Sequence, residues 1–253
     1  MGRLDSKVAL ITGAAGSIGA ATARQFAAEG ARVVLSDLDE DRVAAVAAEL
    51  GGDEVACATV ADVTDSAQVR AAVQLAVDRF GGLDVAFANA GIAGPIAPVS
   101  EFPEDAFDAV LAVNVRGPFL VAKHALAVMR DGGSLIINSS VVGLTSDRGI
   151  AGYATSKHAV VGLMRTAAKE VADRGIRVNT IHPGPVDNAF QHRIEVTATG
   201  AAQDRAAEIF EEMIPLGRHA QAEEIARSVV FLASDDSSFV TGHTLAVDGG
   251  LSI

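Results

Sequence analysis

The regular order of short β-branched runs and Ala-rich amphipathic stretches constrains the fold of this 253-residue chain more than any other feature. The strand-like runs are KVALIT, RVVLSD, EVACATV, DVAFAN, SLIINSS, RVNTIH and TLAV. Helical stretches occupy residues 17–29, 39–50, 65–80, 104–130, 151–174 and 221–233. This alternation predicts a parallel sheet with helices on both faces. We therefore expect an α/β fold: one doubly wound domain over residues 1–253, built on a seven-stranded parallel sheet.

One segment departs from the alternation. Residues 186–216 follow a strand and carry a helical period, but they are charged and are interrupted at Thr197–Gly200. Long excursions of this kind often form a lid over a site, and the alternative is a surface insertion without a role. We predict one or two short helices here, forming a substrate lid within the single domain.

Composition and charge exclude several classes of partner. The formal net charge is −12 and basic residues form no run, so we expect no nucleic acid or anionic membrane surface as a partner. The apolar runs are too short to span a membrane, and the N-terminus has no signal-peptide composition. The single cysteine, Cys57, and the spacing of the six histidines argue against a metal site. We expect a cytoplasmic protein without a bound metal.

A glycine-rich turn, Thr12-Gly13-Ala14-Ala15-Gly16-Ser17-Ile18-Gly19, joins the first strand to the first helix. Glycines let the backbone approach a pyrophosphate, and the helix N-terminus supplies N–H donors to it. The second strand ends at Asp37, which can accept hydrogen bonds from both ribose hydroxyls and repels a 2′-phosphate. No Arg or Lys directly follows Asp37 or lies in the loop. The pattern favours NAD over NADP, the alternative being a structural turn with a solvated carboxylate.

Tyr153 and Lys157 stand four residues apart in the stretch 151–174, so that both side chains share one helix face. A phenol is a weak base at neutral pH, but a nearby ammonium and the positive ring of an oxidised nicotinamide stabilise its phenolate. Such pairs are common on helix surfaces. Here, however, Tyr153 is the only tyrosine of the chain and Lys157 is one of four lysines. We predict that Tyr153 is an acid/base supported by Lys157.

Taken together, these motifs make the chain resemble a short-chain dehydrogenase/reductase of the roughly 250-residue branch, from Lys7 to Gly250. The glycine loop matches that family's TGxxxGxG motif, and Tyr153 with Lys157 matches YxxxK. Ser140 and Asn114 match the serine and asparagine that complete its catalytic tetrad. The resemblance implies a Rossmann-type fold and hydride transfer between a nicotinamide cofactor and an alcohol or ketone.

Shorter motifs of the same family imply further cofactor contacts. Asp62-Val63 matches the pair beside the adenine, Asn89-Ala90-Gly91 the NAG turn, and Pro183-Gly184 with Val186 the stretch that grips the carboxamide. Ala88 replaces a family asparagine, and Asn188 replaces a threonine, which leaves the carboxamide contact of Asn188 open. The expected cofactor-binding residues are Gly13, Ala15, Gly16, Ser17, Ile18, Gly19, Asp37, Leu38, Asp62, Val63, Asn89, Ala90, Gly91, Tyr153, Lys157, Pro183, Gly184 and Val186.

Three functions are compatible with these motifs. The first is an NAD-dependent dehydrogenase of a secondary alcohol, whether cyclic, polyol or steroid-like. The second is a 3-oxoacyl-carrier-protein reductase, but Asp37 and the −12 charge argue against its usual NADPH and its acidic carrier. The third is an NAD sensor without turnover, which we rank last because all four tetrad residues are present. The resemblance also implies a homotetramer formed through the helices at 104–130 and 151–174.

Pro118 lies inside the helical stretch 104–130. Proline has no N–H to donate to the carbonyl four residues earlier, that of Asn114, and its ring clashes with that carbonyl. We expect a bend that leaves the Asn114 carbonyl unpaired, the alternative being a proline tolerated at a kink that exists anyway. In the family that the chain resembles, this carbonyl holds a water that connects the lysine to solvent.

Overall fold

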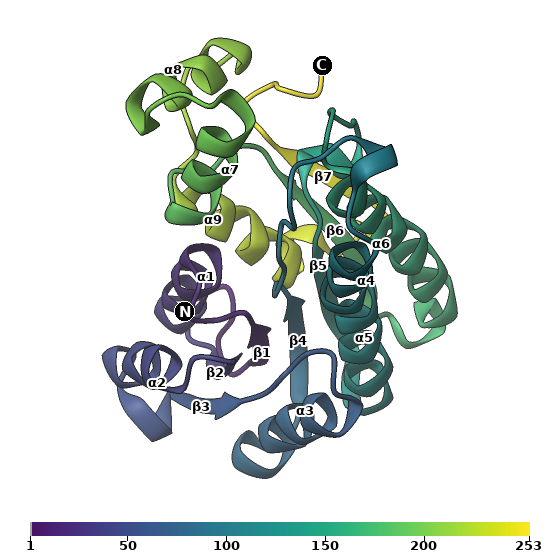
Figure 1. Cartoon of the computed structure of the whole chain (residues 1–253). Helices are drawn as coiled ribbons and strands as arrows, with labels where there is room; N and C mark the ends of the chain where they lie inside the picture. Colours follow the sequence, from purple (N-terminus) through teal and green to yellow (C-terminus); the bar gives the residue numbers. More distant parts are fainter. Residues whose placement is uncertain (1) are drawn as a thin grey trace.

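A parallel sheet in the strand order β3-β2-β1-β4-β5-β6-β7 forms the centre of the computed structural model, which describes residues 2–253 (Figure 1). Every neighbouring pair of strands in it is parallel. The prediction of a seven-stranded parallel sheet is therefore confirmed. The strands are β1 (Val8–Thr12), β2 (Arg32–Asp37), β3 (Ala56–Val60), β4 (Leu83–Ala88), β5 (Met129–Asn138), β6 (Arg177–Pro183) and β7 (Thr244–Val247).

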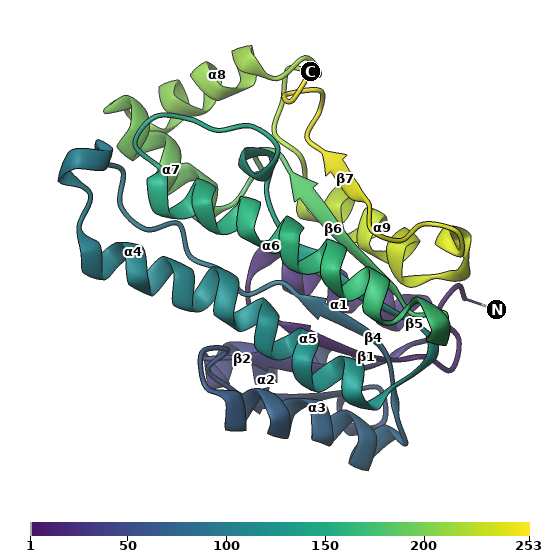
Figure 2. The same cartoon turned by 90° about the vertical axis from the view of Figure 1, so that its right-hand side faces the viewer.

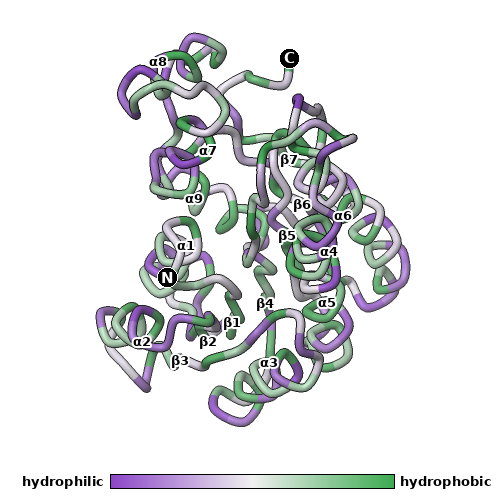
Figure 3. Tube along the Cα trace, viewed as in Figure 1, coloured by the Kyte–Doolittle hydropathy of each residue, from purple (hydrophilic) through white to green (hydrophobic). Residues whose placement is uncertain are grey.

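Helices cover both faces of the sheet, as predicted (Figures 1 and 2). One hydrophobic cluster joins the sheet to α1 (Ser17–Ala28), α2 (Glu40–Glu49) and α9 (Ala222–Ala233). A second joins it to α3 (Ser66–Phe80), α5 (Gly117–Val128) and α6 (Ala151–Glu170). The central strands β1 and β4 are buried along their whole length, which explains why their sequences are apolar without alternation. Figure 3 shows the hydrophobic residues gathered on the strands and the polar ones toward the outside.

The stretch 104–130 is not one continuous helix. Helix α4 (Glu104–Leu111) is followed by a π-helical segment, Ala112–Arg116, before α5 begins. The interruption expected at Pro118 is present, but it is a change of winding that starts six residues before the proline. The expected helix end at residue 130 is wrong, because Met129 already belongs to β5. The exposed residues 130–132 that follow Met129 hide the extended conformation of this strand from a hydrophobicity pattern.

Residues 186–216 form two short helices, α7 (Ala189–Thr199) and α8 (Gln203–Met213), as predicted. We call α7 and α8 the lid helices, after the role that the sequence predicts for them. Gly200 ends α7 in a left-handed conformation, with φ +68°, which accounts for the interruption seen in the sequence. Both views place α7 and α8 together at one end of the molecule, far from α2 and α3 (Figures 1 and 2). Within residues 2–253, no helix is both long and apolar enough to cross a membrane.

Candidate active site

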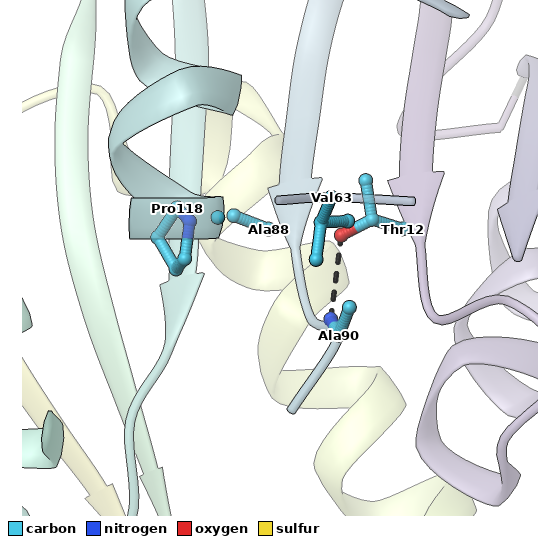
Figure 4. A pocket seen from close by; sticks show the side chains of 6 residues that line it. Thr12, Val63, Ala88, Ala90 and Pro118 are labelled. Carbon is cyan, nitrogen blue, oxygen red and sulfur yellow. Dashed lines mark hydrogen bonds between the residues drawn. The ribbon is translucent and has the colours of Figure 1, made fainter. Parts of the chain in front are cut away.

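Strands β1 and β4 are neighbours in the sheet, and the order of connection reverses between them. In open α/β sheets, ligands bind beyond the carboxyl ends of the strands at such a reversal. A narrow recess lies there, and Figure 4 shows how its side chains converge. Its lining residues are Thr12, Val63, Ala88, Ala90, Gly117 and Pro118. The sheet therefore brings the glycine loop and the NAG turn to one crevice.

The glycine loop fits closely against the NAG turn. A Cβ atom at Gly13, whose φ is +64°, would lie 2.8 Å from the Ala90 Cα, and one at Gly19 would lie 2.2 Å from the Gly13 carbonyl oxygen. The Asn89 side chain donates to the carbonyl oxygens of Thr12 and Gly13, at 3.0 Å each. Two of the loop glycines are therefore required by packing alone, and the loop has its shape before any ligand binds.

The N-terminus of α1 offers free backbone donors to this crevice. Its N-cap is Gly16, which has no side chain to cap the helix, and its first turn carries no acidic residue. The first N–H groups of such a helix, with the positive end of its dipole, favour an anion. The arrangement can hold the pyrophosphate of a dinucleotide.

Asp37, at the end of β2, faces the same loop. Its Oδ2 accepts from the Ala15 N–H at 2.8 Å, and its Oδ1 accepts from the Leu38 N–H at 2.8 Å. The Leu38 side chain is 69 % exposed, and so leaves an apolar surface for a flat ring. On the other side of Ala15, the Arg42 guanidinium donates to its carbonyl oxygen at 2.7 Å.

Arg42 is a residue that the sequence analysis missed, because it considered only basic residues that directly follow Asp37 or lie in the loop. Asp39 caps α2 by accepting from the Arg42 N–H, and this places Arg42 in the first turn of that helix. The guanidinium then reaches back to Ala15, so that a positive and a negative side chain both hold the same loop residue. A helix that starts three residues after a strand-end carboxylate is the signal that could have revealed it.

Asp62 and Val63 stand where β3 leads into α3. The Asp62 Oδ1 accepts from both the N–H and the hydroxyl of Thr64, at 2.8 Å each, while Asp65 is the residue that caps α3. The buried Val63 side chain lines the recess shown in Figure 4. The pair therefore forms one wall of the crevice, beside the glycine loop.

Asn114 lies in the π-helical segment and is buried. Its amide exchanges two hydrogen bonds with the backbone of Ile92, accepting at 2.9 Å and donating at 2.8 Å, and also donates to Ser156 Oγ at 3.0 Å. A Cβ atom at Gly91 would stand 3.3 Å from the Asn114 side-chain oxygen and 3.6 Å from the Lys157 Nζ. Asn114, Gly91 and Lys157 therefore meet in one place.

Tyr153 and Lys157 extend from α6 toward the carboxyl end of β5. The Lys157 Nζ donates to the Asn138 carbonyl at 2.9 Å and lies 5.3 Å from the centroid of the Tyr153 ring. Burial lowers the pKa of Lys157 to about 8. Burial also raises the pKa of Tyr153 to about 12, although a hydrogen bond with the Ser140 side chain opposes this shift. The phenol is therefore neutral at pH 7 and can donate a proton as it stands.

Ser140 follows the end of β5, and a histidine forms a hydrogen bond with its backbone carbonyl. The His182 Nδ1 lies 2.8 Å from the Ser140 carbonyl oxygen, and its Nε2 lies 2.8 Å from the Thr180 hydroxyl. Burial lowers the pKa of His182 to about 4, so the ring is neutral at pH 7 and donates to the Ser140 carbonyl from Nδ1. This contact fixes the backbone of Ser140.

The stretch Pro183–Val186 leads from β6 to the lid helices. A Cβ atom at Gly184 would stand 2.8 Å from the Asp248 Cα, so this turn requires glycine, and Val186 is buried. Asn188 then caps α7 by accepting from the Gln191 N–H at 2.9 Å, and its Nδ2 donates to the Ser17 hydroxyl at 3.0 Å. Asn188, which the sequence analysis left open, therefore connects the lid to the glycine loop.

Phe190, on the first turn of α7, is a second residue that the sequence analysis did not single out. Its ring centroid lies 6.4 Å from that of Tyr153, with the two planes inclined by 49°. An aromatic residue two positions after a helix cap, in a chain with only 4 % aromatic residues, is the signal that could have drawn attention to it. The contact brings the lid against the side chain expected to act as the acid/base.

Comparison with known proteins identifies relatives over nearly the full length. The family model described as "Enoyl-(Acyl carrier protein) reductase" matches residues 13–252. The chain is similar to momilactone A synthase of Oryza sativa subsp. japonica, with 44 % identity over 99 % of this chain and 92 % of the relative. It is also similar to a 3-oxoacyl-[acyl-carrier-protein] reductase of Thermotoga maritima, with 40 % identity over 99 % of this chain and 100 % of the relative.

Solved structures agree with this. The crystal structure of a levodione reductase superposes with a TM-score of 0.94 at 39 % identity, covering 98 % of each chain. A blue fluorescent protein from a metagenomic library, solved in complex with NADPH, superposes with a TM-score of 0.89 at 36 % identity, covering 99 % of this chain and 100 % of that one. The similarity thus extends over the sheet, the crevice and the lid helices alike.

Proposed function

The chain belongs to the short-chain dehydrogenase/reductase family of oxidoreductases, and on this premise we propose that it interconverts a secondary alcohol and a ketone using NAD, with Tyr153 as acid/base. The observation that carries the proposal is the convergence of Asn114, Ser140, Tyr153 and Lys157 beside the glycine-loop crevice. The Lys157 ammonium, 5.3 Å from the phenol ring, is the central contact of this group.

A bound nicotinamide supplies or accepts the hydride in this chemistry. In the reducing direction, the neutral Tyr153 phenol donates its proton to the carbonyl oxygen, and the Ser140 hydroxyl holds that oxygen by a hydrogen bond. In the oxidising direction, the phenol must first lose its proton, which burial disfavours by raising its pKa to about 12. The Lys157 ammonium and the positive charge of the oxidised cofactor then favour the phenolate. Asn114 supports the site from behind, through the backbone of Ile92.

We assign the binding of the cofactor to five segments of the chain. They are the glycine loop, Asp37 with Leu38, Asp62 with Val63, the NAG turn and Pro183–Val186. The Asp37 carboxylate at the loop supports NAD because it accepts from ribose hydroxyls and repels a 2′-phosphate. The neighbour solved with NADPH opposes this assignment, and so does Arg42, since a guanidinium is the usual partner of a 2′-phosphate. Its bond to the Ala15 carbonyl and its proximity to Asp39, 4.0 Å away, already engage it.

A second function has a relative in its favour, the 3-oxoacyl-[acyl-carrier-protein] reductase at 40 % identity. The net charge of −12 weighs against it, since an acidic carrier protein would be repelled. The Phe190 ring beside Tyr153 favours instead a small substrate with hydrocarbon next to its carbonyl, such as a cyclic ketone.

A substrate panel tests the proposal. Cyclic, polyol and steroid alcohols, the matching ketones and a 3-oxoacyl thioester are each assayed with NAD and NADP in parallel, and turnover is followed by the absorbance of the reduced cofactor. We expect activity on a secondary alcohol or its ketone, with NAD preferred. Activity confined to the thioester would establish the carrier-protein function, and binding of NAD without turnover on any substrate would establish the sensor.

We also propose a cytoplasmic homotetramer, with contacts through α4, α5 and α6. Phe119 on α5 supports this, because 47 % of this large apolar residue is exposed in the single chain. Light scattering coupled to size-exclusion chromatography measures the mass of the assembly directly. A monomer at micromolar concentration would overturn the assignment.

A further inference from the structure

The lid helices α7 and α8 have almost no apolar anchor. Each of them buries a single residue, and in α7 that residue is Glu195, which is 0 % exposed. The connection from α8 to α9 buries Ile214, but it also lines a hollow of about 100 Å³ and leaves Leu216 69 % exposed. Hydrophobic burial therefore contributes less to holding these helices than it does in the rest of the fold, and polar contacts carry a larger share.

His219, in the connection between α8 and α9, contacts both lid helices. Its Nε2 lies 2.6 Å from the Glu195 Oε1 on α7, and its Nδ1 lies 3.1 Å from the Glu211 Oε1 on α8. The next residue, Ala220, donates to the Pro185 carbonyl and accepts from the Asp187 N–H, at 2.9 Å each. One buried imidazole thus connects both lid helices to the backbone beside the cofactor stretch.

The protonation state of the His219 ring decides how many of its hydrogen bonds to the two lid helices can form. Each ring nitrogen of His219 faces a carboxylate oxygen, and carboxylates only accept hydrogen bonds, whereas a neutral imidazole has a single N–H. Both contacts are therefore made only by the doubly protonated ring. The second oxygen of Glu195, Oε2, is buried without any hydrogen-bond partner, so this carboxylate has little to replace a donor that it loses. Its remaining donor is the Gln191 side chain, at 3.0 Å.

The surrounding charges favour the protonated ring. Burial opposes the positive charge, but the hydrogen bonds and charges of Glu195 and Glu211 outweigh it and raise the pKa of His219 above its usual 6.5. From α7, His192 faces the ring with centroids 6.3 Å apart and is itself paired with Asp187 at 3.1 Å. Arg218 lies beside the ring, but its guanidinium is bound to Glu224 of α9 at 2.7 Å.

We propose that His219 is a protonation-controlled latch: the doubly protonated ring holds α7 and α8 closed over the site, and loss of one proton releases them. Because α7 begins with Asn188 and Phe190, the latch also sets the contact of the lid with Ser17 and Tyr153. His219 would in this way act as a positioning residue, an effect on catalysis that rests on the proposed function. A group with a raised pKa loses its contribution as the pH rises through that pKa, so the lid loosens as His219 loses its second proton.

Hydrogen exchange of the backbone amides tests the latch without any substrate. Protection factors for α7 and α8, corrected for the intrinsic pH dependence of exchange, are measured on the full chain at about pH 6 and about pH 8.5, on either side of the histidine range. Helix α9 in the same molecule is the internal reference. We expect the lid to lose protection by about tenfold or more at the higher pH, as for a lost charged hydrogen bond, while α9 does not change.

Three variants separate the latch from a merely structural role. In Glu211→Gln, the amide can donate to Nδ1 while Nε2–H donates to Glu195, so the lid should stay protected at both pH values. In His219→Gln, one carboxylate always lacks its donor, and the lid should be loose at both. Glu208 lies on the same helix as Glu211, and its carboxylate accepts from the Arg205 side chain at 2.9 Å. Glu208→Gln therefore removes a charge from α8 without changing the contacts of His219, and should behave as the wild type.

Two results would overturn the proposal: lid protection that is the same at both pH values in the wild type, or Glu211→Gln that loosens with pH as the wild type does. Once a substrate is known, the wild-type KM should rise with pH across the same range, and in Glu211→Gln it should not. A negative substrate panel would reject the proposed function and leave the exchange result standing, so the two failures are distinguishable.

Discussion

Helix α9 and the lid helix α7 are of similar length but are attached to the molecule by different forces. Seven residues of α9 are buried, all of them apolar, and a capping box between Gln221 and Glu224 fixes its start. Helix α7 buries only Glu195. Apolar burial is indifferent to pH, whereas a carboxylate held by a histidine is not. The scaffold can therefore stay folded under conditions in which the lid moves, as expected of a region of low local stability.

The largest effect on stability should come from the α9 side of this comparison. Ile225 is fully buried in the cluster that joins α9 to α1 and the sheet. Ile225→Ala should lower the free energy of unfolding by about 2–5 kcal/mol, the usual result of a large-to-small change in a core. The matched lid variant is Phe190→Ala, which should lower it by less than about 1 kcal/mol. Urea unfolding measures both, and equal losses would contradict the contrast.

The next largest effect should separate chemistry from stability within the scaffold. Tyr153 stands on α6, so removing its hydroxyl should leave the fold and NAD binding intact. Tyr153→Phe should reduce turnover by roughly a hundredfold or more, as expected for a lost acid/base. Steady-state rates and calorimetric titration with NAD provide the two readouts. Turnover near that of the wild type would reject Tyr153 as the acid/base.

The same contrast explains what the sequence could reveal. The strands and the scaffold helices were predictable, because burial on one or both faces imposes a period on their residues. The exposed residues after Met129 in β5 and the π-helical winding at Ala112–Arg116 leave no such period. The contacts of Arg42 with Ala15, and of His219 with Glu195 and Glu211, join segments that only the folded chain brings together. The resemblance to the family identified the four residues of the tetrad. It did not identify the residues that position the tetrad or that contact it from α7.

Asp37 and Arg42 both form hydrogen bonds with the glycine loop, which also meets the lid. Variants at these two residues therefore test the region where the scaffold and the lid come together. Asp37→Ala should narrow the preference for NAD over NADP by about tenfold or more, because it removes a charged acceptor and a repulsive charge together. Arg42→Ala should widen that preference if the guanidinium tolerates a 2′-phosphate. Dissociation constants for the two cofactors decide this, and a wild type that prefers NADP would overturn the assignment.

A smaller effect is expected at the point where the lid meets the scaffold. Asn188→Ala removes the N-cap of α7 and the bond to Ser17, and should destabilise this helix locally by about 1 kcal/mol. Hydrogen exchange should show faster opening of α7 with no change in α9. Asn188→Asp, which keeps the cap, is the control. If α9 loosens together with α7, the lid is not an independent unit.

The smallest effect is expected from Pro118, on the scaffold side. Pro118→Ala restores an N–H that the Asn114 carbonyl can accept, and so should slow proton release if that carbonyl serves a relay. The rate and its solvent isotope effect measure this. If both stay unchanged, the proline affects only the winding of the helix.

Tyr153 is the only tyrosine of the chain and tryptophan is absent, so one residue produces nearly all of the absorption and emission at wavelengths longer than those of the phenylalanines. In most proteins such signals average over many sites. Here they originate at the proposed reaction centre, beside Phe190 and Lys157. Ionisation of the phenol can therefore be followed directly in the spectrum of the unmodified protein. A change in its emission would likewise report the binding of a nicotinamide or the opening of the lid, without any label.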